Sequence, residues 1–76
     1  MSLEEQIKKT LNNFEDSTSE TILEIIDQIR PHFRSELTSE YLAGKIKKIQ
    51  NESDDAKKKN QCKVLLPYFD WYLQGL

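Results

Sequence analysis

Apolar side chains recur every three or four residues along most of this 76-residue chain, which is the spacing of one face of an α-helix. The pattern predicts four helices, approximately at residues 2–14, 18–30, 38–51 and 54–74, joined by short connections. Four isoleucines in the second helix would also suit a strand, but the acidic and amide residues between them fall at helical positions. The sequence therefore predicts one all-α domain over residues 1–76, a small compact bundle of three to four helices.

The expected helix starts carry side chains that satisfy free backbone N–H groups. Ser2 and Glu5 stand three positions apart, which is the spacing of a capping box, and Ser17 and Glu20 repeat it. Ser53 is the expected cap of the last helix, whose acidic first turn complements the positive end of the helix dipole. These signals place three of the four helix starts.

The start of the third helix is predicted from a different pattern. Thr38 is the expected N-cap, because Leu37 and Leu42 have the spacing of a hydrophobic staple around it. Gly44 costs the helix about 1 kcal/mol relative to alanine, which natural helices often accept where another backbone must come close. The side chains expected to point inward are Tyr41, Leu42, Ile46 and Ile49.

Two prolines limit the helices. Pro31 lacks an N–H and disfavours helical backbone at Arg30, so the second helix should end or kink near residue 30. Pro31 suits the start of a short further turn that reaches about Arg34. Pro67 should kink or interrupt the last helix in the same way.

The last fifteen residues hold most of the aromatic side chains of the chain. One helical stripe of this segment is expected to belong to the core, and it consists of Cys62, Leu65, Leu66, Phe69 and Leu73. Val64, Tyr68, Trp71 and Tyr72 extend the apolar surface beyond that stripe. A small bundle cannot surround this helix on every side, so part of this surface should stay exposed.

Two interpretations of the C-terminal aromatic residues remain open. The rings can cap the core with their polar tips in water, or they can form a surface that binds another protein. Aromatic side chains with a wide apolar area and a polar tip are the usual anchors of protein interfaces. The predicted partner-binding residues are Tyr68, Trp71, Tyr72 and Leu76.

Composition agrees with a charged, helix-prone domain. Hydrophobic residues make up 37% of the chain and charged residues 32%, with only two Gly and two Pro, which is too apolar for a disordered tail. The net charge of -2 is unevenly distributed: residues 1–42 hold nine acidic and four basic side chains, and residues 43–63 hold seven lysines and three acidic ones. The two parts can therefore act differently on charged partners.

The lysine cluster at Lys45–Lys63 has three interpretations. It can be a solvated helical face, a docking face for another protein, or a surface that neutralises the phosphates of a nucleic acid. The sequence pI of about 5.3 and the absence of arginine from the cluster weigh against nucleic acid. The residues predicted for electrostatic docking are Lys45, Lys48, Lys57, Lys58 and Lys59.

No pattern of residues points to catalysis, a metal or a cofactor. His32 and Cys62 are the only His and the only Cys, and with Asp70 they form no triad with recognisable spacing. Cys62 on an apolar stripe is typical of a small core residue. The two glycines cannot form a phosphate-binding loop. We therefore expect a protein without enzymatic activity, bound cofactor or small-molecule substrate.

The expected compartment is the cytoplasm. A single cysteine makes no intrachain disulfide, which favours a reducing environment. The chain has no apolar run near the roughly 20 residues that a membrane span needs, and no signal-peptide pattern.

These observations together predict a protein–protein interaction module: a small adaptor, a subunit or an inhibitor of a host protein. Its expected partner is another protein or a second copy of itself, bound through the aromatic C-terminal surface. The alternative is a helical domain that binds nucleic acid through the lysine cluster.

Overall fold

The computed structural model describes residues 2–75, which form a small all-α bundle without any strand in that range. The fold class predicted from the sequence is therefore confirmed. The elements in chain order are α1 (Leu3–Asn12), the 3₁₀ turn η1 (Phe14–Asp16), α2 (Ser19–Ile29), the 3₁₀ turn η2 (Arg30–His32), α3 (Glu36–Gln50), α4 (Asp55–Lys63) and α5 (Leu66–Leu73).

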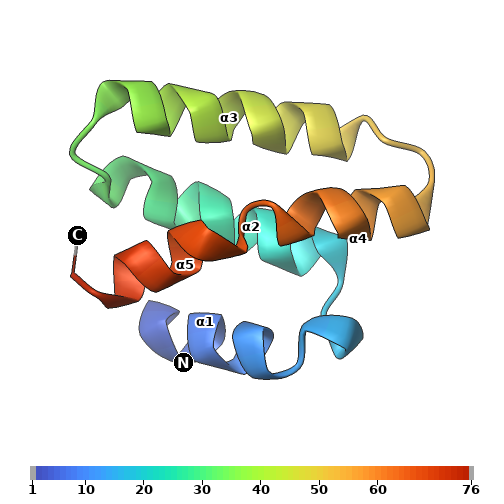
Figure 1. The fold of residues 1–76 in the computed structure, drawn as a ribbon, viewed down its shortest axis with the longest axis horizontal. Helices are drawn as coiled ribbons and strands as arrows, with labels where there is room; N and C mark the ends of the chain where they lie inside the picture. The colour runs from blue at the N-terminus through green and yellow to red at the C-terminus, as the bar shows by residue number, and fades with distance from the viewer. Residues whose placement is uncertain (1, 76) are drawn as a thin grey trace.

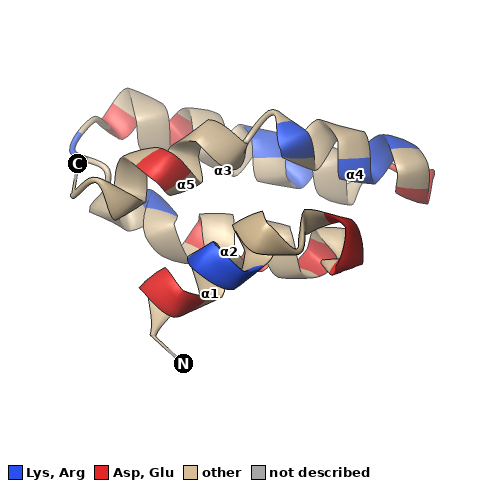
Figure 2. Cartoon of the chain, turned by 60° about the horizontal axis from the view of Figure 1, so that its bottom comes forward, with Lys and Arg blue, Asp and Glu red and all other residues tan. Residues whose placement is uncertain are grey.

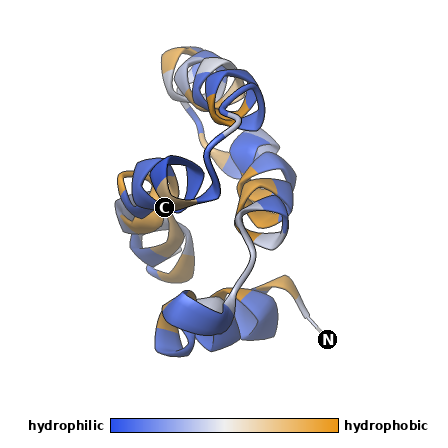
Figure 3. Ribbon diagram, turned by 90° about the vertical axis from the view of Figure 1, so that its right-hand side faces the viewer, coloured by the Kyte–Doolittle hydropathy of each residue, from blue (hydrophilic) through white to orange (hydrophobic). Residues whose placement is uncertain are grey.

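Helix α2 is the central helix and contacts each of the other four. In Figure 1 it lies behind α4 and α5, with α3 above it and α1 below it. Helix α3 runs antiparallel to the path of α4 and α5. The end-on view in Figure 3 shows α2 beside the α4–α5 pair, with α3 and α1 on opposite sides of them.

The core is built around α2, which contributes five of the twelve buried hydrophobic residues. Each other helix adds residues to the same cluster, so the five helices share one core. Cys62 and Phe69 are completely buried, as the sequence predicts, whereas Leu66 and Leu73 are partly buried against the cluster. The buried hydrophobic residues are Ile7, Ile22, Leu23, Ile25, Ile26, Ile29, Leu42, Ile46, Ile49, Cys62, Leu65 and Phe69.

Two predicted helix caps are displaced by one residue. Thr18, and not Ser17, caps α2, because its hydroxyl oxygen accepts a hydrogen bond from the Thr21 backbone N–H at 3.1 Å. Ser17 instead closes η1 and donates its hydroxyl to the Asn13 carbonyl at 2.9 Å. At α4 the cap is Asp54, and not Ser53, since the Asp54 carboxylate accepts from the Lys57 N–H.

The predicted start of the third helix is wrong by two residues. Ser35 caps α3 and accepts a hydrogen bond from the Thr38 N–H at 3.4 Å, so the predicted cap Thr38 lies inside the first turn. Leu37 is consequently helical and 78% exposed, and it makes no staple with Leu42. Tyr41, which was expected to point inward, is 45% exposed.

The predicted last helix is interrupted, as expected from Pro67. The interruption lies at residues 64–65, where Val64 and Leu65 donate to the carbonyls three residues before them. Pro67 falls in the first turn of α5, where a missing N–H costs no helical hydrogen bond. Pro31 lies in η2, directly after α2 ends at Ile29.

The two glycines have different environments. Gly75 has a φ of 89° and follows the end of α5, a conformation that glycine adopts without strain. Gly44 lies within α3, where a Cβ atom would meet nothing within 4 Å among the described residues. No backbone of the bundle therefore requires a glycine at position 44.

Within the described residues, no helix is long and apolar enough to cross a membrane.

Replacement of Ile26 by alanine should lower the free energy of unfolding by about 2–5 kcal/mol, because the side chain is 0% exposed and leaves a cavity. Urea unfolding followed by circular dichroism measures this loss. Leu37→Ala is the matched control, since Leu37 is 78% exposed and should change stability by less than about 0.5 kcal/mol. Equal losses in the two variants would show that Ile26 is not a core residue.

Cys62 should react slowly with iodoacetamide in the folded protein. Its side chain is 0% exposed, and burial raises the pKa of its thiol above the ordinary 9.0. We expect the rate of alkylation at pH 8 to rise by at least about 100-fold in urea, because reaction requires opening of the core. The unfolded thiol ionises first as the pH rises, so the free energy of unfolding should decrease above pH 9.0. Equally fast alkylation with and without urea would contradict the burial of Cys62.

Candidate functional site

Tyr68 of α5 is the centre of an aromatic cluster between α5, α3 and Phe33, which directly follows η2. Its ring centroid lies 5.0 Å from that of Trp71, 5.8 Å from that of Phe33 and 6.2 Å from that of Tyr41. The contacts with Trp71 and Phe33 have edge-to-face geometry, which aromatic pairs prefer. The burial of Tyr68 raises the pKa of its hydroxyl group. This ring therefore joins the C-terminal helix to α3.

Tyr72 makes a second contact between α5 and η2. Its ring lies 5.7 Å from the His32 ring at an angle of 64°. Tyr72 and Tyr68 are half-buried, whereas Trp71 is 50% exposed. Leu76, which the sequence also predicted to bind a partner, lies outside the described residues.

Four large hydrophobic side chains are exposed within residues 2–75, two of them on α3, one on α5 and one between α4 and α5. They are Leu37 at 78%, Val64 at 57%, Trp71 at 50% and Tyr41 at 45%. Leu37 lies one helical turn before Tyr41 and so shares its face of α3. Tyr68 bridges Tyr41 and Trp71. We call the surface formed by Leu37, Tyr41, Val64, Tyr68 and Trp71 the aromatic face.

Two hollows mark the ends of the aromatic face. The first has a volume of about 320 Å³ and is lined by Phe33, Thr38, Trp71 and Gln74. The second has a volume of about 90 Å³ and is lined by Lys45, Lys48, Ile49, Gln61 and Val64. Both are lined by residues of α3 and of the segment 61–74, and the charged residues Lys45 and Lys48 line the second hollow alone.

The second hollow also contains a buried polar atom without a partner. Gln61 Oε1 has no hydrogen-bond partner within the described residues. Burial of an unpaired acceptor normally costs stability, so such atoms are rare in native structures.

The lysines that the sequence grouped together are divided between two sides of the bundle. Lys45 Nζ lies 5.8 Å from the Tyr41 ring centroid, and Lys48 lines the second hollow with it. Lys57 is exposed on α4, one turn before Gln61. Figure 2 shows the lysines of α3 and α4 in neighbouring parts of the two helices.

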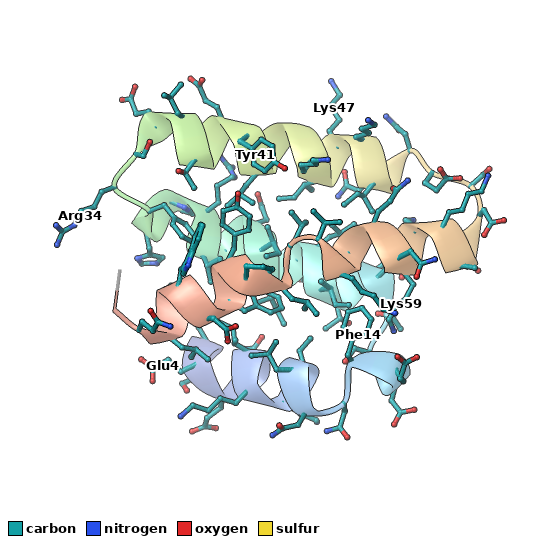
Figure 4. All side chains as sticks on the ribbon, in the orientation of Figure 1. Glu4, Phe14, Arg34, Tyr41, Lys47 and Lys59 are labelled. Atoms are coloured by element: carbon teal, nitrogen blue, oxygen red, sulfur yellow. The ribbon has the colours of Figure 1, made fainter. Side chains whose placement is uncertain are left out.

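Lys58 and Lys59 make contacts within the chain. Lys58 Nζ lies 3.5 Å from a carboxylate oxygen of Glu20, whose pKa is lowered by its own backbone N–H and by this lysine. Lys59 Nζ donates hydrogen bonds to the Ser17 and Glu15 carbonyls and lies 4.7 Å from the Phe14 ring centroid. Figure 4 shows the Lys59 side chain beside Phe14. These two lysines hold α4 against α2 and η1, whereas Lys45 and Lys48 line the second hollow.

His32 and Cys62, the residues with the greatest chemical reactivity, are in different environments. His32 is exposed beside Tyr72, and Cys62 is a free thiol buried in the core. In the described part of the chain, no group of three or more His, Cys, Asp or Glu side chains is arranged to hold a metal ion.

Sequence reasoning assigned Leu37 and Tyr41 to the wrong environments. The signal that could have found them is their spacing with Lys48, because positions 37, 41, 44 and 48 form one stripe of an α-helix. This stripe differs from the core stripe of the same helix, which consists of Leu42, Ile46 and Ile49.

The chain matches no protein-family model, no curated protein and no solved structure. The geometry of the aromatic face is therefore the basis for the function proposed below.

Tyr68→Ala should destabilise the bundle more than Trp71→Ala. Tyr68 is half-buried and contacts three rings, so its loss should lower the free energy of unfolding by about 2–3 kcal/mol. Trp71 is 50% exposed, and its loss should cost about 1 kcal/mol or less. Urea unfolding of the two variants measures the difference. A larger loss of unfolding free energy for Trp71→Ala would contradict the central position of Tyr68 in the cluster.

Proposed function

We propose that this chain is a non-enzymatic protein-binding module whose binding surface is the aromatic face. The observation that carries the proposal is the exposure of four large hydrophobic residues within segment 2–75, two of which, Tyr41 and Trp71, are joined through the ring of Tyr68. Scattered apolar side chains are normal on protein surfaces, whereas their collection in one place is typical of an interaction site.

The packing of the aromatic face also supports binding. Trp71 rests edge-to-face on Tyr68, which is itself held by Phe33 and Tyr41. A ring that is already positioned loses little conformational freedom when a partner covers it, and this lowers the entropic cost of association. Tryptophan and tyrosine in such positions are frequent hot spots of protein interfaces.

The module would act as an adaptor, a subunit or an inhibitor of a host protein. Its partner is another protein or a second copy of the same chain. The cytoplasm is the expected place of this interaction, because the free thiol of Cys62 suits a reducing compartment.

The nucleic-acid alternative has less support. Lys58 and Lys59 contact Glu20 and the η1 region, which leaves fewer lysines free for phosphates. The remaining cluster contains no arginine, which is the commonest reader of base edges. A salt titration of binding to duplex DNA and RNA tests this alternative, because phosphate contacts weaken steeply with salt.

The double variant Leu37→Ser/Trp71→Ser should lose the partner and keep the fold. Both side chains are at least half exposed, so the helical signal should remain and the unfolding free energy should fall by no more than about 1–2 kcal/mol. Light scattering of the wild-type chain first shows whether it self-associates. Affinity purification from the native cell then compares the proteins recovered by the two chains.

Lys47→Ser serves as the matched control, because Lys47 is exposed on α3 and projects away from α5 in Figure 4. The proposal expects the control to retain the partner, or the dimer, that the double variant loses. A double variant that is folded and still binds as the wild type does would exclude the aromatic face as the binding surface.

A further inference from the structure

Helix α3 carries a row of exposed positions on its outer side. Leu37, Tyr41, Gly44 and Lys48 follow one another at spacings of four, three and four residues, so they lie in one row along the helix. All four are exposed, and the buried residues of α3 lie on a different stripe. The row extends over about 16 Å, since each residue adds about 1.5 Å. It therefore has the length of a contact between two helices.

The row has large side chains at one end and an open position in its middle. Leu37 and Tyr41 are two of the four large hydrophobic residues exposed within segment 2–75. A Cβ atom at Gly44 would meet nothing within 4 Å, although an interior glycine makes a helix less stable than an alanine does. A partner with a large side chain opposite Gly44 would occupy this open position.

The charges beside the row change sign along the helix. Glu36 and Glu40 are exposed in the first half of α3, and Lys48 is exposed in the second half. The helix dipole favours an acidic residue in the first turn, but its effect fades beyond that turn and so does not explain Glu40. A partner helix with one sign of charge would be attracted at one end of the row and repelled at the other. The row therefore fits a partner whose charges run in the opposite order.

A second copy of α3 has this order when it lies antiparallel to the first. Its Lys48 would then lie at the end where the first copy has Glu36 and Glu40, and the same pairing would recur at the other end. In a parallel pair, Glu40 would face Glu40 and Lys48 would face Lys48, and these like charges repel each other. The charge pattern therefore selects the antiparallel arrangement.

The shape of the row is also complementary to its own reverse. In the antiparallel pair, Leu37 of each copy would lie against the aliphatic stem of Lys48 of the other copy. Tyr41 of each copy would lie over the open position at Gly44 of the other. A large side chain thus meets a small or flexible one along the whole row, as the interdigitation of packed helices requires.

We infer that the aromatic face binds a second copy of this chain, in a two-fold symmetric dimer whose α3 helices lie antiparallel and cross near Gly44. This inference rests on the proposed function and selects one of its two kinds of partner. Every contact occurs twice in such a dimer, because the same surface is used by both copies. The contact is short, so the dimer is weak.

Helix α1 is a poorer surface for self-association. It also has acidic residues in its first turn and a lysine in its last turn. However, none of the four large hydrophobic residues exposed within segment 2–75 belongs to α1. Exposed ion pairs alone contribute little to association, so the charges of α1 are not sufficient.

Sedimentation equilibrium at low salt tests whether the chain associates with itself. The wild-type chain is measured from about 10 µM to about 1 mM, a range that covers a weak interface. We expect a mass that rises with concentration from one chain toward two, and an affinity that falls when salt is added. A mass of one chain at every concentration overturns the inference, and the purification from the native cell then decides the proposed function separately.

Charge reversal tests the antiparallel arrangement. Lys48→Glu and Glu40→Lys should each weaken the dimer by about five- to tenfold at low salt, because each variant places like charges together at both ends of the contact. The double variant Glu40→Lys/Lys48→Glu should associate with itself at least about threefold more tightly than either single variant, since opposite charges meet again. Failure of the double variant to recover affinity overturns the antiparallel pair.

Lys8→Glu is the matched control for charge reversal. Lys8 is exposed on α1, which lies on the opposite side of the bundle from α3 in Figure 1. The substitution makes the same charge change as Lys48→Glu and should alter the affinity of the dimer by less than about twofold. An equal loss for both variants would mean that net charge, and not the α3 contact, controls association.

Gly44→Ala tests the crossing point. It should weaken the dimer at least about fivefold, because a methyl group takes the space that Tyr41 of the other copy occupies. At a concentration where the chain is monomeric, the same substitution should raise the temperature of unfolding by a few degrees, which shows that the variant is folded. A dimer of unchanged affinity overturns the crossing at Gly44.

The outcomes separate the dimer from the proposed function. If the dimer dissociates in Leu37→Ser/Trp71→Ser but is unchanged by charge reversal, the aromatic face remains the binding surface and the antiparallel α3 pair is wrong. If none of these variants changes the dimer, the two copies meet elsewhere on the chain, and both proposals are wrong.

Discussion

The packing of four isoleucines and one leucine of α2 against the other four helices is the interaction on which the whole bundle depends. These residues contribute five of the twelve buried hydrophobic side chains, and α2 contacts every other helix. Because α2 has helices on several sides, α3 and the α4–α5 segment meet next to each other on its surface. The aromatic face lies along that meeting line, so its position follows from the apolar pattern of α2.

The sequence predicted the elements well and their boundaries less well. Helical periodicity and two prolines were sufficient for the all-α bundle and for the interruption before Pro67. The errors came from neighbouring residues that compete for one role: Ser35 capped α3 before Thr38, and Thr18 capped α2 after Ser17. The choice between nearby hydroxyl groups depends on how the preceding turn ends, and the local sequence does not specify this to the residue.

The candidate site was predictable only in part. Trp71 and Tyr68 were named from the excess of aromatic residues, but their different exposures depend on Phe33 and Tyr41, which lie more than twenty residues earlier in the chain. Leu37 was assigned to a staple because a staple and an exposed helical row share the same spacing over one turn. The intrachain contacts of Lys58 and Lys59 were not predicted either, since they join residues far apart in the sequence.

The contact between α1 and α5, the first and last helices, makes the aromatic face depend on the cooperativity of the entire fold. A terminal helix that touches only its neighbour in sequence can fray without disturbing the rest of a domain. In this bundle α5 packs on both α1 and α2, and Lys59 ties α4 to η1, so the two ends of the described chain support each other. Trp71 and Tyr68 are therefore presented by a closed ring of contacts, and local unfolding of α1 would reduce the fraction of molecules that are competent to bind.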